Sequence, residues 1–260
     1  MKKMHPFHLV TPSPWPLAAS FSILGLVSST VVFNQSKIFL PLIGSLMCCL
    51  LASFMWWSDI FKESTMEGNH SLLIIKGLKI GMIFFIASEV MLFFSFFWGY
   101  YHNSLNPSVE IGVCWPPEGI RPFHPFNIPL MNTFLLLSSG ASVTWSHCSM
   151  MSKDFWQAKD SLLITMALGG YFTYLQSVEY CSAQFSMWDS VYGSCFYFGT
   201  GLHGMHVIVG TIFLGTSYYQ MNKLSCTFNH MVGYECAIWY WHFVDVVWVG
   251  LYYAIYLWKE

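Results

Sequence analysis

The sequence predicts an all-α membrane protein whose chain crosses the bilayer seven times. Hydrophobic residues make up 55% of its 260 residues and charged residues only 9%, whereas a soluble domain carries about 25% charged residues. Seven apolar stretches approach or exceed the roughly 20 residues that a membrane helix needs. They cover residues 15–33, 38–60, 72–104, 128–151, 155–181, 190–222 and 231–258. The strand-like alternation typical of a membrane barrel is not sustained anywhere.

The first two spans have clear boundary signals. Pro12, Pro14 and Pro16 precede or open the first span, where proline is tolerated in a helix. Trp56 and Trp57 lie near the end of the second span, and tryptophan is typical of the membrane interface. A polar connection then leads to the third span, which is as long as the sixth.

The third span carries one ionisable residue at mid-membrane depth. Glu89 follows Lys79 by ten residues, which places it about 15 Å further along a helix. Its helix-face neighbours, such as Phe85 and Phe93, cannot neutralise a carboxylate. Glu89 therefore finds a partner on another helix or carries a proton. Such buried acids are functional candidates, and we expect a role in a proton or lipid environment, with a structural helix–helix hydrogen bond as the alternative.

The remaining spans follow a proline-rich segment that ends at Asn127 and cannot be a regular helix. In the fourth span, Ser138, Ser142 and Ser146 recur every four residues, a stripe that permits close helix packing. Short polar turns separate the last three spans. No internal repeat is found, and we expect residues 1–260 to form a single domain.

Basic residues predict the orientation of the chain. With seven spans, the side of the N-terminus carries eight of the eleven basic residues: Lys2, Lys3, Lys62, Lys76, Lys79, Lys153, Lys159 and Lys223. The opposite side carries Lys37, Arg121 and Lys259. Because basic loops stay on the cytoplasmic or matrix side, we expect the N-terminus there and the C-terminus opposite.

Two pairs of polar residues could carry chemistry. His203 and His206 share one face of the sixth span, and they could hold a metal or haem or make hydrogen bonds between helices; we favour the hydrogen bonds. His242 and Asp245 share a face of the seventh span. They could form a proton relay, although a polar pair packed against a neighbouring helix is the simpler interpretation.

A separate group of residues lies at headgroup depth on the side of the N-terminus. Trp57, Lys62, Glu63, His70 and Lys223 either bind lipid headgroups or only anchor the helices at the interface. The eight cysteines form no thiol cluster of the kind a zinc or iron–sulfur site needs. We therefore expect no metal site, and we expect the histidines of residues 5–8 and 121–125 to be loop residues on opposite sides. The small net charge of −2 argues against a nucleic-acid partner.

Long motifs in these segments resemble subunit III of cytochrome c oxidase, of the mitochondrial kind. The resemblance spans nearly the whole chain. It is carried by HPFHLVTPSPWP, WWSDIFKEST, KGLKIGMIFFIASEVMLFFSFFWGYYH, CWPPEGI, MNTFLLLSSGASVTWSH, YFTYLQSVEY, VYGSCFYFGTGLHGMHVIVG and WYWHFVDVVW.

The resemblance implies a seven-helix subunit in which helices one and two are separated from the other five by a V-shaped, lipid-filled cleft. It implies a non-catalytic role in a proton-pumping oxidase that reduces oxygen to water, with haem a and copper in partner subunits. Subunit I would be the main contact, with subunit II and other subunits nearby, in the mitochondrial inner membrane. Structural phospholipids such as cardiolipin, phosphatidylglycerol or phosphatidylethanolamine would bind this chain.

The resemblance also assigns individual residues. Glu89 falls on the family's membrane acid facing the cleft. Trp57, Glu63 and His70 fall on lipid-contacting positions, with Phe85 and Lys223 as further positions.

One alternative is a stand-alone proton-coupled transporter that uses Glu89, His242 and Asp245. It should show inverted repeats and broken helices, which the sequence lacks. Another alternative, a haem-binding protein that uses His203 and His206, should retain haem when it is purified alone.

Overall fold

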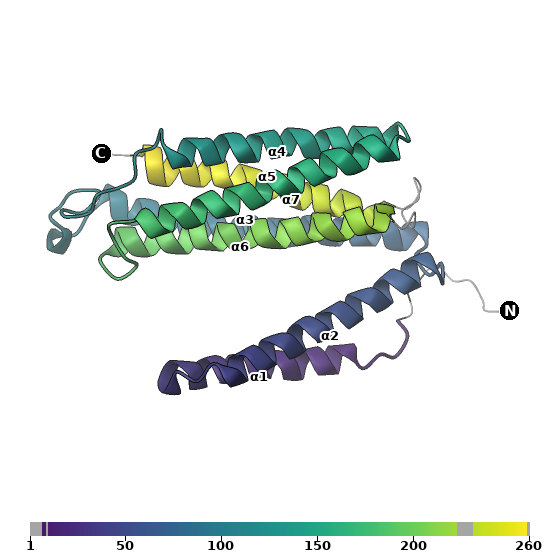
Figure 1. Ribbon diagram of the computed structural model, residues 1–260. Helices are drawn as coiled ribbons and strands as arrows, with labels where there is room; N and C mark the ends of the chain where they lie inside the picture. Colours follow the sequence, from purple (N-terminus) through teal and green to yellow (C-terminus); the bar gives the residue numbers. More distant parts are fainter. Residues whose placement is uncertain (1–6, 9, 223–230, 259–260) are drawn as a thin grey trace. The chain divides into compact units, whose positions relative to one another are not determined.

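The computed structural model describes residues 7–8, 10–222 and 231–258, and within these ranges all regular structure is helical (Figure 1). Seven α-helices are present among the described residues, as the sequence predicts. They are α1 (Trp15–Ser36), α2 (Leu40–Thr65), α3 (Leu72–Leu105), α4 (Ile128–Met151), α5 (Phe155–Ser182), α6 (Val191–Asn222) and α7 (Val232–Leu251). A 3₁₀ turn, η1 (Val109–Ile111), interrupts the proline-rich segment, and a π-helical segment, η2 (Tyr252–Leu257), continues α7.

Four of these helices, α1, α2, α3 and α6, are long and apolar enough to cross a membrane by length and composition. Helices α4, α5 and α7 have lower hydropathy, in part because they carry polar side chains that point into the protein. Ser139 and Ser146 of α4 and Glu179 of α5 are completely buried. Polar residues inside a membrane protein commonly face the bundle interior, so crossing by α4, α5 and α7 stays a prediction.

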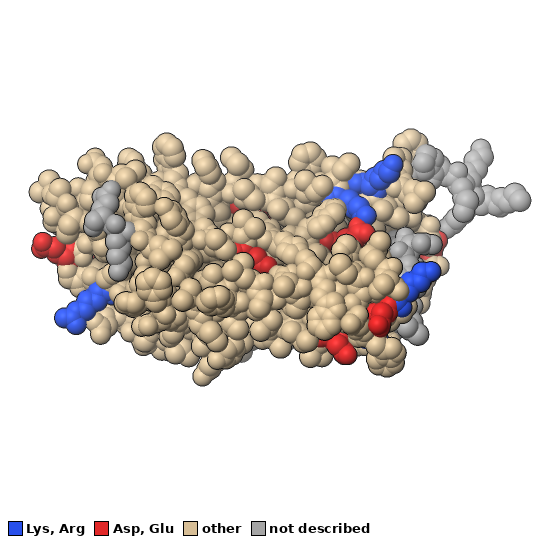
Figure 2. All heavy atoms as spheres, turned by 90° about the horizontal axis from the view of Figure 1, so that it is seen from above, with Lys and Arg blue, Asp and Glu red and all other residues tan. Residues whose placement is uncertain are grey.

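Charged side chains gather near the ends of the face that Figure 2 shows, and a broad band between them is almost uncharged apart from one group of acidic atoms. A band with so few charges is what the hydrocarbon core of a bilayer requires, because a charge at its centre costs about 2.5–3.5 kcal/mol on insertion scales.

Two compact units make up the chain: Met1–Leu78 and Lys79–Glu260. The continuous helix α3 passes from one unit into the other. The prediction of a single domain over residues 1–260 stays a prediction.

The first unit is built on the hairpin of α1 and α2. Ser29 and Ser45 join the two helices through hydroxyl groups 2.7 Å apart, and Gly25 lies next to Ser45. At the other end of the hairpin, the Trp15 indole nitrogen donates to an Asp59 carboxylate oxygen. Most large apolar side chains of both helices are exposed. A face of this composition needs lipid or another apolar surface.

The second unit has its core around Trp241 of α7, which is completely buried. The Trp241 indole nitrogen donates to the Ser139 hydroxyl of α4 at 2.9 Å. Gly169 of α5 and Gly210 of α6 leave the space that the indole occupies, since a Cβ at either position would lie 2.6 or 2.9 Å from the ring. One aromatic side chain therefore contacts three neighbouring helices.

The ends of the first two helices differ from the expected spans. Helix α2 continues to Thr65, five residues beyond the predicted end at 60, because polar residues extend it. The Ser64 and Thr65 hydroxyls donate to the Phe61 carbonyl at 2.8 Å, and Lys62 pairs with Asp59 at 3.0 Å. Helix α1 continues to Ser36 and ends where Lys37 takes a left-handed conformation with φ 58°.

Candidate functional site: the Glu89–His206 pair

Glu89 of α3 has its partner on α6. The Glu89 Oε2 atom lies 3.0 Å from His206 Nε2, and the Glu89 and His206 side chains are 20% and 12% exposed. The partner is therefore another helix of the same chain, one of the two outcomes that the sequence leaves open for this acid.

The other ring nitrogen of His206 fixes the proton count of the pair. His206 Nδ1 lies 2.7 Å from the Leu202 carbonyl oxygen, and a carbonyl only accepts, so Nδ1 carries a proton. His206 Nε2 and Glu89 Oε2 then share one further proton. The pair is either imidazolium with carboxylate or neutral imidazole with carboxylic acid, and its net charge is zero in both forms.

Aromatic rings surround the pair. The rings of Phe93, Tyr240 and Phe243 have centroids 5.4, 6.2 and 6.0 Å from the His206 ring. Phe85 stacks on Tyr240 with centroids 6.3 Å apart, so this predicted lipid-contacting residue belongs to the wall of the same site. Rings packed at these distances limit access of water and strengthen the electrostatic interaction inside.

His203 lies one turn from His206 but points elsewhere. Its side chain is completely buried, and its Nε2 donates to the Val244 carbonyl of α7 at 3.1 Å. Phe172 and Trp248 pack on its ring, with centroids 5.5 and 5.2 Å away. The two histidines thus make separate hydrogen bonds to α7 and α3, and this geometry favours helix packing over a shared metal or haem.

His242 and Asp245 do not form a close pair. His242 Nδ1 and Asp245 Oδ2 are 3.9 Å apart, beyond hydrogen-bond distance. Asp245 packs against α4, where a Cβ on Gly140 would lie 2.6 Å from its Oδ2. Among the described residues, no hydrogen bond joins His242 or Asp245 to Glu89, so the three side chains of the transporter alternative lie in two separate places.

The residues predicted to bind lipid divide between the two units. Trp57, Glu63 and His70 belong to the first unit, and Trp57 is 66% exposed. Phe85 belongs to the second unit. Lys223 lies outside the described residues.

The structure also brings His8 to Glu63 and His70, with one donor atom of each within 4.8 Å of the others. The sequence interpretation treated His8 as a loop residue and missed this grouping. The signal available was topological, because a two-helix hairpin returns the end of α2 to the side from which α1 starts.

Comparison with known proteins gives the family. The model of the family described as "Cytochrome c oxidase subunit III" matches residues 5–260. The chain belongs to the cytochrome c oxidase subunit III family. It is 49% identical over 254 residues to cytochrome c oxidase subunit 3 of Ornithorhynchus anatinus, covering 98% of this chain and 97% of that protein.

Other members of the family match over similar lengths. Identity to the subunit 3 of Rhipicephalus sanguineus is 47% over 254 residues, covering 98% of this chain and 99% of the relative. Identity to that of Bos taurus is 49% over 255 residues, covering 98% and 97%. The chain is therefore a subunit of cytochrome c oxidase, with the helical and apolar character of a membrane protein.

Proposed function

We propose that this chain is a non-catalytic core subunit that stabilises the catalytic part of the oxidase, holds structural lipids and supports proton uptake. The observation that carries the proposal is the use of its intramembrane histidines. His203 Nε2 bonds to the Val244 carbonyl, and the two ring nitrogens of His206 bond to Leu202 and Glu89. Side chains that could hold a haem are thus engaged in hydrogen bonds within the protein, and each histidine makes one of them to another helix.

The partners follow from family membership. We propose that subunit I is the main contact, that subunit II and other subunits complete the complex, and that haem a and copper reside there. The complex would sit in the mitochondrial inner membrane, with this N-terminus on the matrix side and the C-terminus in the intermembrane space. Its seven helices would cross the membrane with the family's V-shaped lipid cleft between α1–α2 and the other five.

Lipid binding is proposed at Trp57, Glu63, His70, Phe85 and Lys223, for cardiolipin, phosphatidylglycerol or phosphatidylethanolamine. The support from the structure is the exposed apolar surface of α1 and α2 and of the start of α3. Interfacial tryptophan and histidine next to such a surface suit a lipid that presents acyl chains below and a polar head above.

Support of proton uptake is proposed for Glu89. The shared proton of the Glu89–His206 pair can shift between oxygen and nitrogen without a change of net charge. A neutral pair of this kind keeps an acid at mid-membrane depth at lower cost than an isolated carboxylate. The pair would buffer the environment of the proton path and take no part in electron transfer.

The test is removal of this chain from the purified oxidase, followed by its return with defined phospholipid. We expect the haem spectrum to be unchanged after removal, while turnover decays faster and proton uptake slows. Return of the chain with cardiolipin should restore both properties. A haem spectrum that is lost in proportion to the chain would contradict the non-catalytic role.

A further inference from the structure

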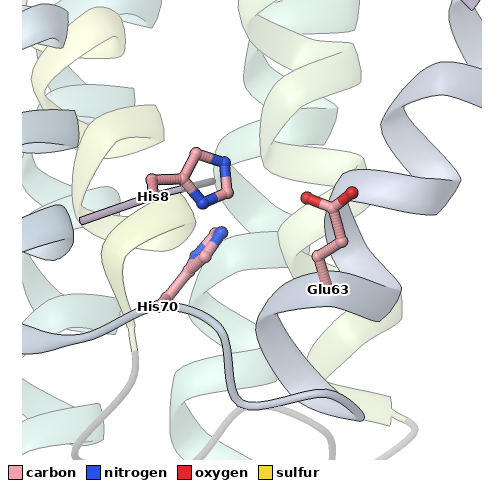
Figure 3. A group of neighbouring side chains, drawn as sticks. All are labelled: His8, Glu63 and His70. Atoms are coloured by element: carbon pink, nitrogen blue, oxygen red, sulfur yellow. The ribbon is translucent and has the colours of Figure 1, made fainter. Parts of the chain in front are cut away.

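Three side chains of the first unit converge near the start of the chain. One donor atom each from His8, Glu63 and His70 lies within 4.8 Å of the others. In Figure 3 the imidazoles of His8 and His70 lie next to each other, and the Glu63 carboxylate points from its helix toward them. The two rings meet edge to face, with centroids 5.7 Å apart and an interplanar angle of 84°.

The local fold explains how His70 comes to lie beside Glu63. Helix α2 ends with the Met66 and Glu67 amides bonded to the Lys62 carbonyl at 2.9 and 3.2 Å. Gly68 then takes a left-handed conformation with φ 63°, which glycine adopts without steric cost. The chain reverses, and the Asn69 amide bonds to the Glu63 carbonyl at 3.2 Å. This turn holds the next residue, His70, against the last turn of the helix.

A second contact holds the segment before α1 against the end of α2. The Thr11 hydroxyl donates to Glu63 Oε1 at 3.3 Å. Such a bond orients a carboxylate in the way that outer-shell partners orient metal ligands. Glu63 and His70 are half-buried and His8 is exposed. Two ligands are therefore positioned by the fold, and the third can rotate into place.

We propose that His8, Glu63 and His70 bind a Zn²⁺ ion. Two imidazoles and one carboxylate are a ligand set that Zn²⁺ prefers, with a fourth position left to water. With metal–ligand distances of about 2.0–2.2 Å, tetrahedral geometry requires donors roughly 3.3–3.5 Å apart. The donor atoms, now within 4.8 Å, come to this spacing by side-chain rotation. The bound ion joins the segment before α1 to the turn after α2.

This site is distinct in chemistry from the headgroup site proposed at Glu63 and His70. A carboxylate attracts a metal cation, whereas in a headgroup site it pairs with a donor such as the ammonium group of phosphatidylethanolamine and not with the phosphate. The substitution Glu63→Gln therefore weakens Zn²⁺ binding and leaves or strengthens the binding of an anionic phospholipid. The Zn²⁺ site and the lipid headgroup site can therefore be tested separately, and either can fail without the other.

The experiment titrates ZnCl₂ into the intact oxidase after treatment with a chelator and counts retained zinc by elemental mass spectrometry. We expect the wild-type complex to bind one more equivalent than complexes carrying His8→Ala, Glu63→Gln or His70→Ala, with affinity lowered at least tenfold in each variant. His102→Ala removes an exposed histidine of α3 and serves as the matched control, with unchanged binding. His70→Cys should retain the ion, because a thiolate replaces the imidazole as a ligand.

Zinc K-edge absorption and lipid analysis complete the test. The additional zinc of the wild type should show two imidazole nitrogens in its first shell. Equal zinc in all variants would mean an adventitious ion only and would overturn the proposal. Loss of phospholipid without loss of zinc in Glu63→Gln would also overturn it. His70→Cys is the control for misfolding, because it keeps a metal ligand at this position. A His70→Cys complex that is folded but binds no zinc contradicts the site.

Discussion

Glu89 and His206 are separated by 117 residues, yet Glu89 Oε2 lies 3.0 Å from His206 Nε2. Because His206 Nδ1 already donates to the Leu202 carbonyl, the pair shares a single proton and has no net charge. Helix α3 can thus carry an acid in its apolar part without a net charge. This pairing joins α3 to α6 and supplies a site where a proton can move within one hydrogen bond.

The substitution Glu89→Gln should leave assembly of the oxidase and its haem spectrum nearly unchanged. The glutamine amide can donate to neutral His206, so the link between α3 and α6 persists while the shared proton is lost. Native electrophoresis and an optical spectrum measure this, with Glu118→Gln in the exposed loop as a matched control. Failure of assembly in Glu89→Gln alone would show that the carboxylate itself is structural.

Replacing only Glu89 by leucine should destabilise the complex more than replacing both Glu89 and His206 by leucine. Glu89→Leu leaves a largely buried imidazole nitrogen without a partner, at a cost of about 1–3 kcal/mol. The double variant with His206→Leu removes both polar groups. We expect a coupling energy on the order of 0.5–3 kcal/mol from thermal inactivation of the four complexes. Additive effects would mean that the two side chains do not interact.

Gly169→Ala should destabilise the second unit, whereas Gly170→Ala should not. A Cβ at Gly169 would lie 2.6 Å from the Trp241 ring, but no atom lies within 4 Å of the position it would occupy at Gly170. Overpacking in a core typically costs about 1–3 kcal/mol. The midpoint of thermal unfolding in detergent checks the difference. Similar midpoints for these adjacent substitutions would contradict the packing of Trp241 described above.

Trp241→Phe should lower stability by less than Trp241→Ala. Phenylalanine loses the hydrogen bond to Ser139, worth about 0.5–1.5 kcal/mol, and part of the ring volume. Alanine leaves a cavity that costs roughly 3–5 kcal/mol. Trp156→Ala is the control because Trp156 is 77% exposed. An equally small effect of Trp241→Ala and Trp156→Ala would show that Trp241 is not central to the core.

Tyr256→Phe should destabilise the end of α5. The Tyr256 hydroxyl donates to Glu179 Oε1 at 2.7 Å, and Glu179 is completely buried. Removal of the hydroxyl leaves a buried acceptor, with a cost of about 1–3 kcal/mol. Tyr253→Phe, at an exposed position, is the control. Hydrogen exchange at the end of α5 should accelerate in the first variant and stay unchanged in the second.

Sequence patterns predicted the seven helices because long apolar runs and prolines mark their positions. The predicted helix ends were less accurate where polar residues continue a helix, as Lys62 to Thr65 do in α2. No sequence pattern predicts the π-helical segment that continues α7.

The candidate site was predictable only in part. The position of Glu89 showed that it needs a partner or a proton, but a partner 117 residues away cannot be read from spacing. His203 and His206 share a helix face, and the structure directs them to different helices. His8 was missed because the histidines of residues 5–8 were compared only with those of residues 121–125, whereas the hairpin of α1 and α2 brings together residues from both of its ends.

The most direct test of a non-catalytic subunit is a mild-detergent purification through a tag on this chain, with an optical spectrum and mass identification of its partners. We predict a large haem-containing complex that includes subunit I, with the pigment retained on the other subunits after this chain is stripped away. A chain that purifies alone and keeps haem would contradict the account.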